Sequence, residues 1–91
     1  MYHTKFQEKV FETPITLGTK LGRWAIFHQL PVAKIAVATG ATRQSVYNWM
    51  KGGEVFIAYQ PAVMRVINCL QSSKTAEEAW RNICQEFNLV P

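Results

Sequence analysis

The sequence has few of the residues that catalysis and metal binding require. It contains only two histidines, His3 and His28, and two cysteines, Cys69 and Cys84, and none of them has a partner at the spacing of a metal site. No glycine-rich loop follows an expected strand to hold a phosphate, and most carboxylates lie toward the two ends of the chain. These absences argue against an enzyme and against a bound metal ion or cofactor.

Long apolar runs are also missing. No stretch approaches the roughly 20 apolar residues that a membrane-spanning helix needs. The first residues, MYHTK, lead into mixed polar sequence rather than into an apolar secretion segment. We therefore expect a cytoplasmic protein with no membrane partner, in which Cys69 and Cys84 stay reduced as small buried residues.

Acidic residues are scarce in the middle of the chain. The net charge of +4 comes from 10 basic residues against 6 acidic ones. Residues 1–19 are neutral and residues 66–91 are slightly acidic, whereas residues 20–65 carry Glu54 alone against Lys20, Arg23, Lys34, Arg43, Lys51 and Arg65. A local positive excess of this kind favours a polyanionic partner such as double-stranded DNA.

What the sequence does contain is enough apolar material for one compact domain, since 48% of its 91 residues are hydrophobic. Apolar spacings of three and four predict helices over residues 20–29, 61–71 and 76–87. Thr19 is expected to cap the first, Pro61 to begin the second, and Thr75 with Glu78 to form a capping box before the third. On the first helix, one buried face is expected from Leu21, Trp24, Ala25 and His28, broadened by Phe27.

The sequence does not decide the conformation of two segments. Residues 2–12 fit a helical spacing and an extended one, so we treat residues 1–18 as an arm that either packs on the core as a strap or reaches a second subunit or DNA. Residues 54–60, EVFIAYQ, suit a short extended connection or a small wing strand. The expected fold is all-α: a bundle of about five helices in a single domain over residues 19–91, with the arm or wing as its only extended part.

The most informative stretch is residues 32–50, VAKIAVATGATRQSVYNWM, which has the pattern of two short helices joined by a tight turn. Ile35 and Ala36 share one face of the first helix, and Gly40 can adopt the left-handed conformation of the turn. Thr42 is placed to cap the second helix. Its buried positions are Val46 and Trp49, which leaves an outward side without an acidic residue, made of Arg43, Gln44, Ser45, Tyr47 and Asn48.

This order of residues resembles the helix-turn-helix of lambda and Cro type repressors of phages and bacteria. The resemblance rests on Ile35-Ala36, Gly40-Ala41, Thr42 to Val46, and Trp49. It departs at Val32, where the family often has a phosphate-binding Gln, and at Thr39, where an apolar residue is usual. The resemblance implies a sequence-specific regulator of transcription, a nucleoid-associated repressor that works as a homodimer and reads the major groove with residues 42–50.

We expect the candidate DNA contacts to fall into two groups. Arg43 and Gln44, in the first turn of the second helix, suit the hydrogen-bonding edges of guanine and adenine. The resemblance adds Ser45, Tyr47 and Asn48 as further base-reading candidates. The phosphate contacts are expected from residues at the two ends of that helix and from nearby basic residues: Thr42, Lys51, Lys34, Arg23 and Lys20.

Two other functions remain open, because one scaffold can carry several. The chain could bind a protein of the transcription machinery through its aromatic residues, or serve as an accessory factor in DNA packaging or recombination. The aromatic residues available for a protein interface are Trp24, Phe27, Tyr47, Phe56 and Tyr59. A homodimer contact is expected from residues 2–12 or from the last helix, through Trp80 and Phe87.

Overall fold

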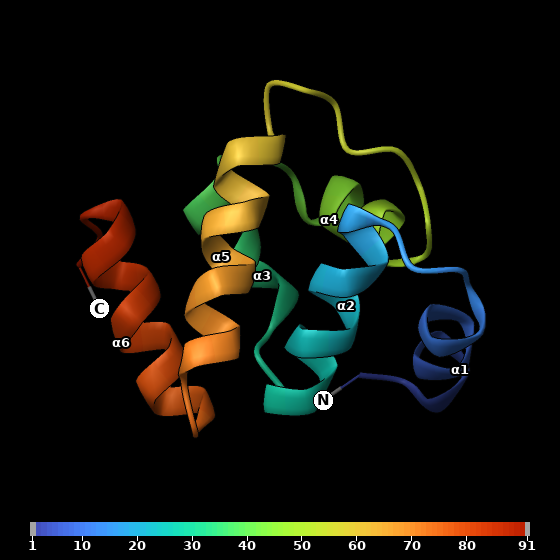
Figure 1. Cartoon of the computed structure of the whole chain (residues 1–91), viewed down its shortest axis with the longest axis horizontal. Coiled ribbons are helices and arrows are strands. Elements are labelled where there is room, and N and C mark those ends of the chain that lie inside the picture. Colours follow the sequence, from blue (N-terminus) through green and yellow to red (C-terminus); the bar gives the residue numbers. More distant parts are fainter. Residues whose placement is uncertain (1, 91) are drawn as a thin grey trace.

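Six helices follow one another along residues 2–90, the part of the chain that the computed structural model describes, and this part contains no strand (Figure 1). The all-α prediction is confirmed. The helices are α1 Thr4–Glu12, α2 Leu17–His28, α3 Val32–Thr39, α4 Arg43–Met50, α5 Gln60–Ser72 and α6 Ala76–Phe87.

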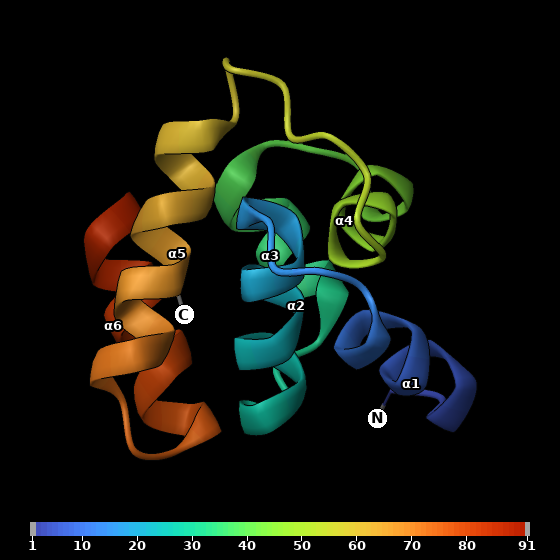
Figure 2. The ribbon, with the colours of Figure 1, turned by 45° about the vertical axis from the view of Figure 1, so that its right-hand side comes forward.

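The N-terminal segment forms the helix that the sequence left open. In Figure 2, α1 lies beside α2 and below α4, so it packs on the body of the protein as a strap instead of extending from it as an arm. Val10 carries this packing, because its side chain is fully buried and reaches the backbone of Gly22 in α2. The helix ends at Glu12, since Thr13 precedes Pro14 and a residue before proline avoids the helical conformation.

The second helix begins earlier than expected, and Thr19 is not its cap. Thr16 is the N-cap, and its hydroxyl accepts the backbone N–H of Thr19 at 3.2 Å. The Thr19 hydroxyl in turn accepts the backbone N–H of Thr16 at 2.6 Å, which completes a capping box built from two threonines. The predicted cap lies three residues too late, because a threonine hydroxyl at either position can accept a backbone N–H.

The buried face of α2 differs from the prediction: it includes Ile26, leaves out Phe27 and buries Trp24 only in part. Leu21 and Ala25 are fully buried and His28 is nearly so, but Phe27 is 72% exposed. The His28 imidazole meets the backbone carbonyl of Leu70 at 2.7 Å, which satisfies a buried polar ring through α5. Phe27 therefore does not belong to the core and remains on the surface.

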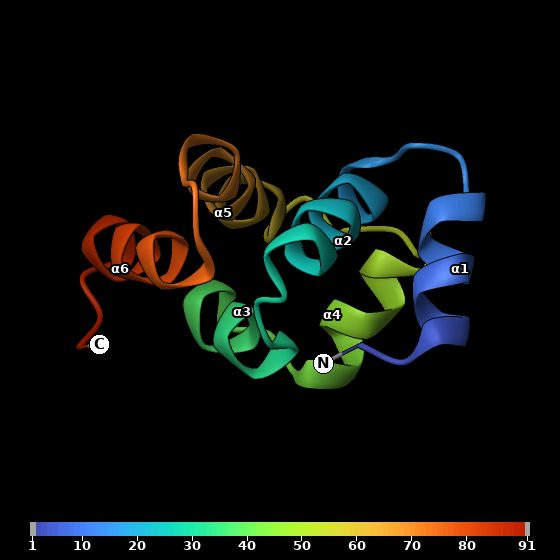
Figure 3. The same cartoon turned by 90° about the horizontal axis from the view of Figure 1, so that it is seen from below.

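The core lies around α2, which packs against α1, α4 and α5, while α3 packs against α4, α5 and α6 (Figure 3). The helix predicted over residues 61–71 is confirmed as α5, and its apolar stripe is buried: Val63, Val66, Ile67 and Leu70. The last helix begins after Thr75, whose hydroxyl accepts the backbone N–H of Glu78, but the predicted capping box is not completed, because the Glu78 carboxylate accepts the backbone N–H of Lys74 instead. Cys84 is buried and Cys69 is partly buried, and neither is joined in a disulfide.

Residues 51–59 connect α4 to α5 by an irregular loop, so the wing strand is not formed. The loop is fixed at its centre by Val55, which is buried, and by the Gln60 side-chain amide, which donates to the Val55 carbonyl at 3.0 Å.

Within residues 2–90, no helix combines the length and the apolar character needed to span a membrane.

Candidate nucleic-acid interface

The two helices of the motif are joined as the sequence predicts. Gly40 ends α3 with a φ of 77°, in the left-handed region that a residue with a side chain adopts only with strain. Thr42 then caps α4, because its hydroxyl accepts the backbone N–H of Ser45 at 3.1 Å. Three residues between the helices, 40–42, are therefore enough to turn the chain sharply.

The two departures from the repressor pattern have simple structural outcomes. Val32 is buried, so its position contributes to the core and offers no polar contact at the surface. Thr39 is also nearly buried, and its hydroxyl donates to the Ile35 carbonyl one turn earlier at 2.9 Å. The polar atom is satisfied within α3, so it does not loosen the core.

One side of α4 is completely enclosed. Val46, Trp49 and Met50 are buried against α2 and α3. The approach of α2 is close enough that a Cβ atom on Gly18 would lie 2.2 Å from the Trp49 carbonyl oxygen. A Cβ atom on Gly22 would lie 3.0 Å from Cβ of Met50. The two glycines allow α2 and α4 to cross at this short separation, and they fix α4 against the core.

The other side of α4 faces solvent with donors and acceptors. Arg43, Gln44 and Asn48 are exposed, and Tyr47 is 38% exposed. The Gln44 side-chain amide donates to the Asn48 side-chain oxygen at 3.1 Å, which aligns two of these side chains along the helix. Ser45 is half-buried and bonds to the Thr42 hydroxyl. This side can therefore present a guanidinium, two amides and a phenol to a polar partner.

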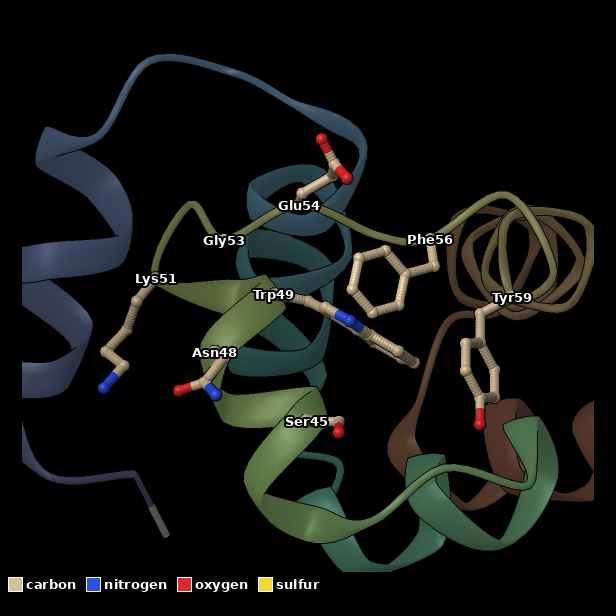
Figure 4. A pocket seen from close by; sticks show the side chains of 8 residues that line it. All are labelled: Ser45, Asn48, Trp49, Lys51, Gly53, Glu54, Phe56 and Tyr59. Atoms are coloured by element: carbon tan, nitrogen blue, oxygen red, sulfur yellow. The ribbon is translucent and has the colours of Figure 1, made fainter.

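A groove separates α4 from the loop that follows it (Figure 4). The rings of Trp49 and Tyr59 lie 5.4 Å apart and join the helix to the start of α5. In Figure 4, Asn48 and Lys51 extend away from these rings, toward the outward side of α4. Lys51 is exposed at the C-cap of α4, so its ammonium group lies at the end of the polar surface.

A second hollow lies where α3 and α4 both begin. Arg43 and Tyr47 of α4 line it together with Tyr2 and the first residues of α3. α3 follows Pro31 and has no side-chain cap; the backbone N–H of Lys34 donates to the Pro31 carbonyl, which leaves those of Val32 and Ala33 available to an acceptor. A guanidinium beside free helix N–H groups can bind an anion.

Three of the predicted phosphate contacts lie elsewhere. Gly18 and Gly22 face α4, and at roughly 100° per residue Lys20 falls on the opposite side of α2. The Arg23 guanidinium donates to the carbonyls at the end of α1, at 3.1 Å from each. The Lys34 ammonium lies 4.9 Å from the ring centre of Trp80, on the side of α3 that meets α6.

The remaining predicted residues are brought together on or beside α4: Thr42, Arg43, Gln44, Ser45, Tyr47, Asn48 and Lys51. The prediction missed the contribution of α1, since the ring of Phe6 meets that of Tyr47 at 5.3 Å. The helical spacing of Tyr2, Phe6 and Val10 contained that signal, but the proline after it suited an extended segment equally well. The role of Gly18 had no signal, because it depends on the approach of a distant helix.

The described residues contain no group of three histidine, cysteine or acidic side chains placed to hold a metal ion. Comparison of the chain with protein-family models, with curated proteins and with solved structures found no significant match. We therefore infer the function from the geometry of α3 and α4 and from the chemistry of their exposed side chains.

Proposed function

We propose that this chain is a sequence-specific, double-stranded DNA-binding regulator of transcription, a repressor of the Cro and lambda type, with α4 as its recognition helix. One observation carries the proposal: α4 is polar and free of acidic residues on its outward side, while its other side is locked into the core. A helix of eight residues is about 12 Å long, which suits the major groove of B-DNA.

Base reading is assigned to the first turn of α4. Arg43 can donate two hydrogen bonds to guanine, and Gln44 can both donate to and accept from adenine. The bond from Gln44 to Asn48 orients the Gln44 amide before DNA arrives, which lowers the entropy lost on binding. Asn48 and Tyr47 lie one turn further along the same side, where they extend the contact to neighbouring base pairs or sugars.

Phosphate contacts are assigned to the two ends of the motif. Lys51 and Thr42 lie at opposite ends of α4, so they can meet the backbone on either side of the groove. The uncapped start of α3 adds backbone donors beside Arg43. Lys20 and Arg23 do not belong to this surface, because one lies across α2 and the other is bonded to α1.

The test is a selection of bound sequences from a random duplex pool, followed by fluorescence anisotropy with the enriched duplex and with a mixed-sequence duplex. We expect an enriched motif, and tighter binding to it than to the mixed sequence. Amide shifts in an NMR titration should concentrate in α4 and at the start of α3. A folded chain that enriches no sequence and binds no duplex at low salt would refute the proposal.

The structure also offers an observation in favour of the second candidate, a protein-binding module. An apolar hollow on the side of α2 away from α4 is lined by Phe11, Trp24 and Phe27, among others. Phe27 is 72% exposed and Phe11 50%, so two large rings meet solvent side by side with Trp24. If no duplex binds, this surface becomes the leading site, and Phe27→Ser should abolish the protein interaction without unfolding the chain.

A further inference from the structure

The aromatic rings of Tyr2, Phe6 and Tyr47 form a row that connects the N-terminal segment to the outward side of α4. The rings of Tyr2 and Phe6 are stacked, with centroids 5.6 Å apart and planes 15° from parallel. The next contact is nearly perpendicular: the ring centroids of Phe6 and Tyr47 lie 5.3 Å apart, and their planes meet at 85°. Both distances lie in the range of favourable aromatic pairs. Tyr47 is the only ring of the three that belongs to the proposed DNA surface.

The first ring of this row is tied to the start of α3. The Tyr2 hydroxyl donates to the backbone carbonyl of Leu30, directly before the Pro31 that begins α3. The Gln7 side-chain amide donates to the Tyr2 carbonyl at 2.8 Å, which holds the beginning of the chain against α1. Burial, and secondarily the nearby Tyr47, raises the pKa of Tyr2 above its ordinary value, so its hydroxyl remains a donor even in alkaline solution.

The row therefore contacts both helices of the motif from outside it. Tyr2 bonds to the chain where α3 begins, and Phe6 packs on α4. Tyr2, Arg43 and Tyr47 also line the same hollow. By contrast, the part of α1 that packs on α2 uses Val10, one turn further along. Val10 is thus the fully buried anchor of α1, whereas Tyr2 and Phe6 are partly buried at the edge of the core and reach the two helices of the motif.

We propose that Tyr2 and Phe6 are positioning residues for DNA recognition, which hold the Tyr47 side chain and fix α4 relative to the start of α3. This inference rests on the proposed DNA-binding function. A tyrosine that is already held loses less side-chain entropy when it contacts DNA. Loss of the row should therefore weaken binding to the preferred sequence, while mixed-sequence binding, which depends on phosphate charge, should change little.

The chain offers matched variants to test this. Phe6→Ala removes the central ring, and Phe6→Leu removes the ring while keeping most of the apolar volume. Phe11→Ala is the control on the same helix, because Phe11 is half-exposed and packs on Arg23 rather than on α4. Val10→Ala is the control for general loss of α1 packing, since Val10 is fully buried, lies beside Gly22 of α2 and is not one of the three rings.

We expect both Phe6 variants to lower affinity for the enriched duplex by about 3- to 10-fold, with affinity for the mixed-sequence duplex changed less than about 2-fold. Phe11→Ala and Val10→Ala should leave the ratio of the two affinities unchanged. Circular dichroism at the assay temperature verifies that each variant is folded. An unchanged ratio in both Phe6 variants would overturn the positioning role while leaving DNA binding in place.

A measurement without DNA separates this inference from the function on which it rests. With fluorine-labelled tyrosine, the Tyr47 resonance of the free protein should shift and narrow in Phe6→Leu, because the ring gains rotational freedom, and should stay in place in Phe11→Ala. A Tyr47 signal equally mobile in the unaltered chain and in Phe6→Leu would overturn the inference. Failure of the unaltered chain to bind any duplex would instead overturn the proposed function, and the recognition role of Tyr2 and Phe6 with it.

Discussion

Replacement of Gly18 by alanine tests most directly how α4 is held in place. The added Cβ atom would lie 2.2 Å from the Trp49 carbonyl oxygen and 2.8 Å from the carbonyl carbon, so α2 and α4 must separate. The obstructing atoms belong to the backbone, and no change of rotamer can relieve the contact. The perturbation therefore acts on the separation of two helices, not on a flexible side chain.

The expected loss of stability follows from two opposing effects. Overpacking of a close-packed site costs about 1–3 kcal/mol, and a backbone obstacle places Gly18→Ala near the upper limit. Alanine in a helix recovers at most about 1 kcal/mol relative to glycine. The net loss in the free energy of unfolding is about 2 kcal/mol, which lowers Tm by about 8–16 °C in a chain of this size.

Urea denaturation followed by circular dichroism measures this loss, with Gly40 as the comparison. A Cβ atom on Gly40 meets nothing within 4 Å, so Gly40→Ala is destabilising only through its φ of 77°. Asparagine tolerates that conformation, and Gly40→Asn should recover most of the lost stability, whereas Gly18→Asn should recover none. A Gly18→Ala variant as stable as the unaltered chain would refute the close crossing of α2 and α4.

Four further predictions concern the proposed function. Affinity for duplex DNA should fall steeply as salt rises, because bound lysines and arginines release condensed counterions; anisotropy across a salt series that gave a flat response would contradict phosphate binding. Gln44→Ala should weaken binding to the enriched duplex by about 1–3 kcal/mol and hardly change mixed-sequence binding, whereas Lys51→Ala should weaken both equally. Lys20→Ala should leave both affinities unchanged, since Lys20 lies across α2 from α4; a loss equal to that of Lys51→Ala would place a second DNA surface there. The protein should bind a two-fold symmetric site as a homodimer, and light scattering that gave a monomer mass both free and on the enriched duplex would exclude this.

Much of the scaffold could be predicted from local sequence, because the relevant signals act over short distances. The buried stripe of α5 follows from apolar spacing, and the ends of α3 and α4 follow from Gly40 and Thr42. The cap of α2 was misplaced by three residues, from Thr16 to Thr19, because either threonine can accept a backbone N–H. Local sequence therefore indicates that a helix exists more reliably than it indicates the residue at which it begins.

The parts that escaped prediction depend on contacts between distant residues. Phe27 has the spacing of a core residue on α2, but no other helix covers that side, so it is exposed. Arg23 counted as a phosphate contact by charge alone, yet its guanidinium is occupied by carbonyls at the end of α1. Charge and periodicity describe one helix at a time. Whether a side chain is buried, exposed or hydrogen-bonded depends on which other helix packs beside it.

The two sides of α4 are supported by different parts of the protein, and this bears on how recognition could change. The buried side is fixed by α2 and α3, so replacing Arg43 or Gln44 on the outward side should change stability by no more than about 0.5 kcal/mol. Sequence preference could then shift without loss of the fold. Tyr47 is the exception, because its ring also packs on Phe6, so a substitution there changes the proposed DNA surface and the attachment of α1 together.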